Sequence, residues 1–195
     1  MRACLSVCTL FVLVALVGLG QTPARSWKDR GEYDLYARIS NEAGASQRLE
    51  LLRTWVRLYP VTGFEQERQH SFLTAYGAAG QGDEAFATAR ALLASYPSDL
   101  SAIYAICYWA PRLKRPPQDA VGIVRKTAAD VLARLDELIP ESSPRREMGS
   151  FFDSIETGQP VKTEQRSSPD RKADRARLQQ VASEALNWAN AGASR

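Results

Sequence analysis

The residues that could carry nucleophilic or metal chemistry are few and widely separated in this chain. It has one histidine, His70, and three cysteines, of which Cys4 and Cys8 lie in an apolar N-terminal segment and Cys107 lies among large apolar residues. A nucleophilic thiol needs a base that activates it, and His70 is 37 positions from Cys107. So few His and Cys side chains exclude most zinc-type sites. We therefore expect Cys107 to be a buried small hydrophobic residue, and we expect no metal site and no cofactor.

The sequence signatures of several enzyme classes are missing as well. It contains no G-x-S-x-G, no H-E-x-x-H, no phosphate-binding G-x-x-x-x-G-K-[ST] and no paired-glycine dinucleotide fingerprint. The glycines of Gly80-Gln81-Gly82 are explained by a tight turn between two helices. Carboxylates such as Asp34 and Glu84 fall where solvated helix faces are expected. We expect no catalytic activity, and a hydrolase with an unrecognised carboxylate pair is the enzymatic alternative.

Charge and composition favour a folded protein without a polyanionic partner. Apolar residues make up 45% of the 195-residue chain, charged residues make up 24%, and the formal net charge is +3. A charge this small creates no strong field for nucleic acid, which we do not expect as a partner. Two basic clusters fit solvated helix faces, with contact to an anionic membrane surface as the alternative. Their members are Arg112, Lys114 and Arg115 in one cluster, and Arg171, Lys172, Arg175 and Arg177 in the other.

The first 24 residues have the pattern of a secretory signal peptide. A short basic start, Met1-Arg2, precedes residues 3–20, which carry no charge, and small residues follow. The sequence thus predicts an exported protein, periplasmic or secreted, with Cys107 as its only cysteine after cleavage. The alternative is a single-pass membrane anchor, because 18 apolar residues are at the lower limit for spanning a bilayer.

Every convincing pattern after the signal segment is helical. Apolar residues recur three and four positions apart, and Ser46, Asp83 and Ser98 are the expected N-caps of three helices. One long helix is predicted from about residue 119 to 138, after a connection at 111–119 that contains three prolines and cannot be helical throughout. Residues 141–168 are predicted to form a linker or mobile loop. A last helix is predicted over 169–195, with Ser168 as its N-cap.

Three of these helices end in a bulky residue followed by proline, and the positions before each proline agree. The prolines, Pro60, Pro97 and Pro140, are 37 and 43 residues apart. A period of this length with two helices in each unit is typical of a helical repeat array. Counting back from the prolines, the shared packing positions are Trp55, Leu92 and Leu135 at five, Leu52, Ala89 and Leu132 at eight, Ala85 at twelve, Ile39 and Tyr76 at twenty-one, and Leu35 and Phe72 at twenty-five.

The residues that carry this period resemble the tetratricopeptide repeat family. The central unit, 66–97, is most similar to that family's consensus, whereas the first unit has Arg48 where alanine is expected. The resemblance implies an all-α fold: a short right-handed superhelical array of antiparallel helix pairs, with units at about 31–60, 66–97 and 98–140. Small residues at Ala85 and Ala89 would let the two helices of a unit pack closely.

The same resemblance implies a function and a site. Family members bind partners in a concave groove lined by the first helix of each pair. Carried over to this chain, the groove positions are Tyr33, Ala37, His70, Thr74, Tyr104 and Tyr108. The partner would be another protein or an extended peptide. The interpretation is a non-enzymatic scaffold in the bacterial cell envelope, and the alternative is a membrane-tethered structural or assembly component that keeps residues 3–20 as its anchor.

The start "WKDRGEYDLY" and the later "EALNWANA" also resemble exported bacterial proteins of this family, which usually continue into further repeats. In this chain the last predicted helix has no second helix after it. Its apolar face, with Leu186 and Trp188, is expected to fold back on the array, to pair with another chain, or to belong to a shortened product.

Overall fold

The computed structural model describes residues 26–140 and 171–192, and this part of the chain is all-helical, with no strand among the described residues. The expected all-α class is confirmed. No helix within the described ranges is both long and apolar enough to cross a membrane. The elements are α1 (Arg30–Asn41), α2 (Ala45–Leu58), α3 (Glu65–Ala78), α4 (Gly82–Ser95), α5 (Leu100–Trp109), the 3-10 turn η1 (Ala110–Arg112), α6 (Ala120–Ala133), α7 (Leu135–Leu138) and α9 (Arg171–Gly192).

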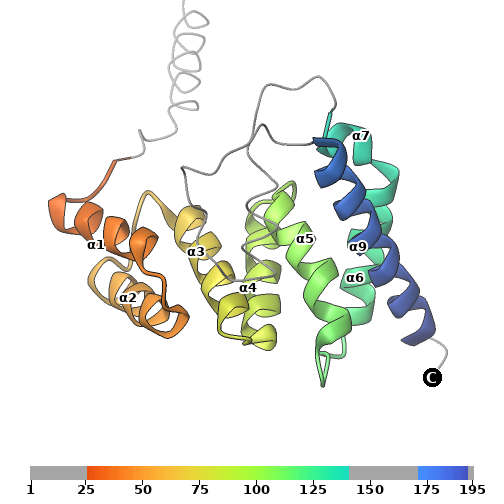
Figure 1. Ribbon diagram of the computed structural model, residues 1–195, viewed down its shortest axis with the longest axis horizontal. Coiled ribbons are helices and arrows are strands. Elements are labelled where there is room, and N and C mark those ends of the chain that lie inside the picture. The colour runs from red at the N-terminus through yellow and green to blue at the C-terminus, as the bar shows by residue number, and fades with distance from the viewer. Residues whose placement is uncertain (1–25, 141–170, 193–195) are drawn as a thin grey trace, which may run out of the picture.

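The helices stand side by side, largely in chain order, as Figure 1 shows. Each helix from α1 to α6 contacts the next one along the chain, and α9 packs against both α6 and α5. Consecutive helices run in opposite directions. The Tyr59 hydroxyl, at the end of α2, therefore lies 2.9 Å from Asp29 Oδ1, just before α1.

The buried side chains form two clusters that meet at α3. The N-terminal cluster consists of Leu35, Ile39, Leu49, Leu52, Trp55 and Ala75. The C-terminal cluster contains the buried residues of α4, α5, α6 and α9, and Tyr76 packs against both. Of the eleven predicted packing positions, Phe72, Tyr76 and Leu132 are partly buried against a cluster and the other eight are buried within one.

The turn between α3 and α4 depends on its glycines. Gly80 has a φ of +67°, a left-handed conformation that L side chains rarely adopt. A Cβ on Gly82 would lie 3.0 Å from Trp109 Cε3, so a side chain at this position would require the Trp109 ring of α5 to shift. Beyond the turn, Ala85 and Ala89 are completely buried.

Several predicted helix boundaries were wrong. The N-cap of α2 is Gly44 and not Ser46, and α4 begins at Gly82, which places Asp83 in its first turn. The cap of α5 is Asp99 and not Ser98, because Asp99 Oδ1 accepts a hydrogen bond from the Ala102 N–H at 3.0 Å. The long helix predicted to begin near residue 119 is interrupted at Arg134, between α6 and α7. Ser168 and the predicted linker 141–168 lie outside the described residues.

Helix α9 folds back on the stack, one of the three outcomes expected for the last helix. Leu186 and Trp188 are partly buried against the C-terminal cluster. The side chain of Arg125 in α6 donates from Nη2 to the Ala189 carbonyl at 3.0 Å. The side of α9 that faces away from the stack is polar, and its exposed residues include Gln179, Gln180, Glu184, Asn187 and Asn190.

Candidate binding face

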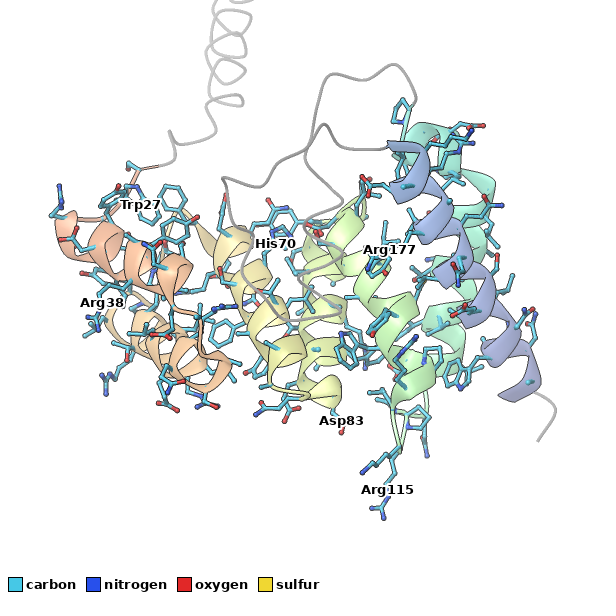
Figure 2. The ribbon with its side chains drawn as sticks, viewed as in Figure 1. Trp27, Arg38, His70, Asp83, Arg115 and Arg177 are labelled. Atoms are coloured by element: carbon cyan, nitrogen blue, oxygen red, sulfur yellow. The ribbon has the colours of Figure 1, made fainter. Side chains whose placement is uncertain are left out.

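The predicted groove residues lie on α1, α3 and α5, which are the alternate members of the stack. Tyr33 is the most exposed, at 44%, whereas His70, Thr74 and Tyr108 are partly exposed. Tyr104 is completely buried. Figure 2 shows the side chains on these helices, with His70 labelled. We call the surface of α3 and α5 that carries His70, Thr74 and Tyr108 the first-helix face.

His70 connects α3 to the start of α5. Its Nε2 lies 2.8 Å from Asp99 Oδ2, and Gln66 Nε2 donates to the same oxygen at 2.9 Å. The Asp99 side chain is only 4% exposed, while that of His70 is 26% exposed. Burial opposes ionisation of Asp99, but the hydrogen bond and charge of His70, together with the other two donors, outweigh it and lower the pKa of Asp99. His70 therefore joins one helix pair to the next.

Two tyrosines of α5 stack along one side of that helix. The rings of Tyr104 and Tyr108 are 6.0 Å apart and nearly parallel. The Arg177 guanidinium of α9 lies 5.9 Å from the Tyr104 ring, and that of Arg112 lies 3.9 Å from the Tyr108 ring. Because α9 packs on α5, Tyr104 lies below the surface that a partner would reach. Tyr108, with Arg112 against its ring, and Trp109, packed edge-on against Tyr108, are the aromatic side chains of α5 that are left partly exposed.

The contacts described for Tyr33, Thr74 and Ala37 are with residues other than His70, Tyr104 and Tyr108. Tyr33 packs edge-on against Trp27, with ring centres 5.8 Å apart. Thr74 Oγ1 donates to the Ser71 carbonyl at 3.1 Å. Ala37 lines a shallow, open depression with Arg38, Asn41, Glu42 and Leu51.

Sequence reasoning missed a set of buried polar groups around the first helix pair. Glu32 is completely buried and accepts hydrogen bonds from the Lys28 backbone N–H at 2.8 Å and from Trp55 Nε1 at 3.0 Å. Burial raises the pKa of Glu32, but these bonds and one from Thr62 lower it overall. A signal was present in the sequence, because Glu32, Leu35 and Ile39 are spaced three and four apart and so share one helix face.

Two buried arginines secure the connections next to this pair. Arg48, the departure from the repeat consensus, donates from Nε to the Glu42 carbonyl at 3.0 Å. Arg68 donates from Nη1 to the Tyr59 carbonyl at 2.6 Å. Each guanidinium thus donates to a carbonyl at the end of a helix or in the turn after it. Both side chains are buried and so are not available to a partner at the surface.

Cys107 has the environment expected for a structural cysteine. Its side chain is 1% exposed, and burial raises the pKa of its thiol to about 12. Within the described residues, no group of three or more His, Cys, Asp and Glu side chains is placed to hold a metal ion. Of the basic clusters, Arg112, Lys114 and Arg115 are exposed at the α5–α6 connection, whereas Arg175 of α9 pairs with Asp136.

No protein-family model, curated protein or solved structure matches this chain. The described residues define an all-α protein of stacked helices, and its function has to be argued from the first-helix face itself.

Proposed function

We propose that this chain is an exported, non-enzymatic scaffold that binds another protein or an extended peptide in the bacterial cell envelope. Its architecture would be a short right-handed superhelical array of tetratricopeptide-like helix pairs, preceded by a signal segment at residues 1–24. The partner would lie along the first-helix face, across α3 and α5.

The order of helix contacts supports this architecture. Each helix pair packs against the next one along the chain. Helix α9 packs against α5 and α6, where the first helix of a following pair would lie in such an array. Neighbour-to-neighbour stacking of this kind produces an extended surface from alternate helices. The small residues Ala85 and Ala89 lie at the buried contacts of α4, as such a pair requires.

The observation that carries the proposal is the environment of Tyr108. Its ring is partly exposed, stacked on Tyr104 and covered on one side by the Arg112 guanidinium. Tyrosine and arginine are the side chains that most often contribute strongly to protein interfaces. Here both are held in place by neighbours, so little side-chain entropy is lost when a partner binds.

His70 and Cys107, the residues most suited to catalysis, have structural roles in this fold. His70 holds Asp99 at the start of α5, and the Cys107 thiol is buried with a pKa of about 12. A thiol with this pKa has almost no thiolate at neutral pH and is a poor nucleophile. Both placements favour a binding role over a catalytic one.

Position-specific photocrosslinking in the cell envelope tests the proposal. A photoreactive amino acid replaces Thr74 on the first-helix face, or Ala87, which is exposed on α4 of the same pair. We expect a discrete crosslinked product from position 74 and little from position 87. Adding Tyr108→Ala should weaken the product at 74. Equal products from both positions, or no effect of Tyr108→Ala, would contradict the proposal.

A further inference from the structure

The exposed large hydrophobic side chains lie at one edge of the stack. We call it the proline edge; it consists of the turns after Tyr59 and Tyr96 and the N-terminal ends of α1, α3 and α5. The Tyr59–Asp29 and His70–Asp99 contacts bring these turns and helix starts together. The large hydrophobic side chains exposed within the described residues are Tyr33 (44%), Val56 (41%), Leu58 (57%), Val61 (79%) and Tyr96 (37%).

The opposite edge has a different character. It contains the α1–α2 connection, the α3–α4 turn and the connection between α5 and α6. Arg112, Lys114 and Arg115 are exposed there, and none of the exposed large hydrophobic residues of the described chain lies at this edge. In Figure 2, Arg115 and Asp83 project from this edge, whereas Trp27 lies at the opposite one.

The N-terminal segment joins the stack at the proline edge. Trp27 is partly exposed and stacks on Phe64, just before α3, with ring centres 3.7 Å apart. Residues 3–20 carry no charge, and only residues 21–26 separate them from Trp27. Six extended residues reach at most about 22 Å. An apolar segment held in a bilayer would therefore keep the proline edge close to the lipid headgroups.

We propose that the proline edge rests on the surface of a phospholipid bilayer, with residues 3–20 retained as the membrane span. Leu58 and Val61 would enter the headgroup boundary, and Trp27 and Tyr33 are the amphipathic rings that favour this region. Lys28 and Arg57 are exposed at the same edge and would face anionic headgroups. The acidic groups at this edge include Asp29, Asp34, Glu65 and Glu67. Asp29 accepts a hydrogen bond from Tyr59, Asp34 pairs with Arg30 at 2.8 Å, and Glu65 pairs with Arg68.

This orientation has a consequence for partner binding. The helix axes run from one edge to the other, so they would point away from the bilayer (Figure 1). The first-helix face would then look sideways, along the membrane surface. The inference rests on the membrane-tethered form of the protein, whereas the scaffold proposal holds with or without the span.

The test uses the full chain reconstituted into vesicles of phosphatidylcholine with a minority of phosphatidylglycerol. In a Cys4→Ser, Cys8→Ser background, a fluorophore is attached at Val61→Cys on the proline edge or at Gln118→Cys, which is exposed in the basic α5–α6 connection. Cys107 is buried, and we expect it not to react under native conditions. Lipids with a quencher near the headgroup then report which edge touches the bilayer.

We expect quenching several times stronger at position 61 than at position 118. Stronger quenching at position 118 would place the basic edge on the lipid and overturn the proposal. Equal quenching, or loss of the chain from the vesicles in an alkaline carbonate wash, would overturn it too. N-terminal sequencing from the native host adds a second readout. A chain that has lost residues 1–24 would contradict the tethered orientation, yet would leave the crosslinking test of the scaffold untouched.

Discussion

The two core clusters of this molecule are stabilised in different ways. The N-terminal cluster is rich in aromatic rings, with Trp27, Tyr36 and Phe64 packed against it. The buried side chains of Glu32 and Arg68 both contact Trp55. The C-terminal cluster consists mostly of alanine and aliphatic residues. In the first, the large Trp55 ring is bonded to buried Glu32, whereas the second contains many small side chains that pack closely.

The difference follows from how closely the helices can approach. The completely buried Ala85, Ala89 and Ala105 allow neighbouring helices to pack closely. Large rings such as Trp55 fill more space, and the indole N–H must then find a buried acceptor, which Glu32 supplies. The Trp55 ring of the N-terminal cluster is thus tied to a buried carboxylate, whereas the alanines of α4 make only close apolar contacts.

Removal of the central ring should have the largest effect. We expect Trp55→Ala to lower the free energy of unfolding by about 3–5 kcal/mol, because it leaves a cavity and removes a donor from buried Glu32. Trp55→Phe keeps most of the ring and should cost about 1–3 kcal/mol through the lost hydrogen bond. Urea denaturation measures both. If Trp55→Phe leaves the free energy of unfolding unchanged, the Trp55–Glu32 hydrogen bond does not stabilise the N-terminal cluster.

Enlarging a buried alanine should disturb the other cluster. Ala89→Leu forces extra volume between α4 and its neighbours, and we expect a loss of about 1–3 kcal/mol. Ala91→Leu is the matched control on the same helix, because Ala91 is exposed, and it should change stability by less than about 0.5 kcal/mol. Thermal unfolding separates the two variants. Equal effects would mean that α4 does not depend on small side chains.

The stability that the His70–Asp99 contact contributes to the fold should depend on pH. The pKa of Asp99 in the folded chain lies below its ordinary value of 3.8. Its ionised form therefore contributes stability above that pH, and the contribution is lost as the pH falls through the lowered pKa. We expect Asp99→Asn to cost about 1 kcal/mol at neutral pH and to flatten the loss of stability on acidification. An unchanged pH profile would exclude Asp99 as the acid-sensitive link.

The smallest effect is expected when the native chain is treated with a thiol reagent, because its target in the folded region, Cys107, is buried. Because burial raises its pKa to about 12, the thiol should resist maleimide labelling in the native chain at pH 8 and react after denaturation. Peptide mass spectrometry distinguishes it from Cys4 and Cys8. Rapid native labelling would show that the centre of the C-terminal cluster opens readily.

The sequence was sufficient where the pattern is periodic and local. Apolar residues three and four positions apart predicted helices throughout, and the all-α class is confirmed for the described residues. Burial of Tyr104 could not be anticipated, because the helix that covers it begins 67 positions later, at Arg171. Exact helix caps were missed since several polar residues compete at each start, and Asp99 rather than Ser98 has the geometry to reach the Ala102 N–H.

The central claim is that the described helices form a single stack in which α9 packs against α5 and α6. A Cβ on Gly192 would lie 3.5 Å from Val121 Cγ2 of α6, so a disulfide can test it directly. In the Cys4→Ser, Cys8→Ser background, we expect Val121→Cys with Gly192→Cys to oxidise readily and to raise the melting temperature. Val121→Cys with Asn187→Cys, on the exposed side of α9, should remain reduced. Failure of the first pair to form a disulfide, or equal oxidation of both pairs, would contradict the account.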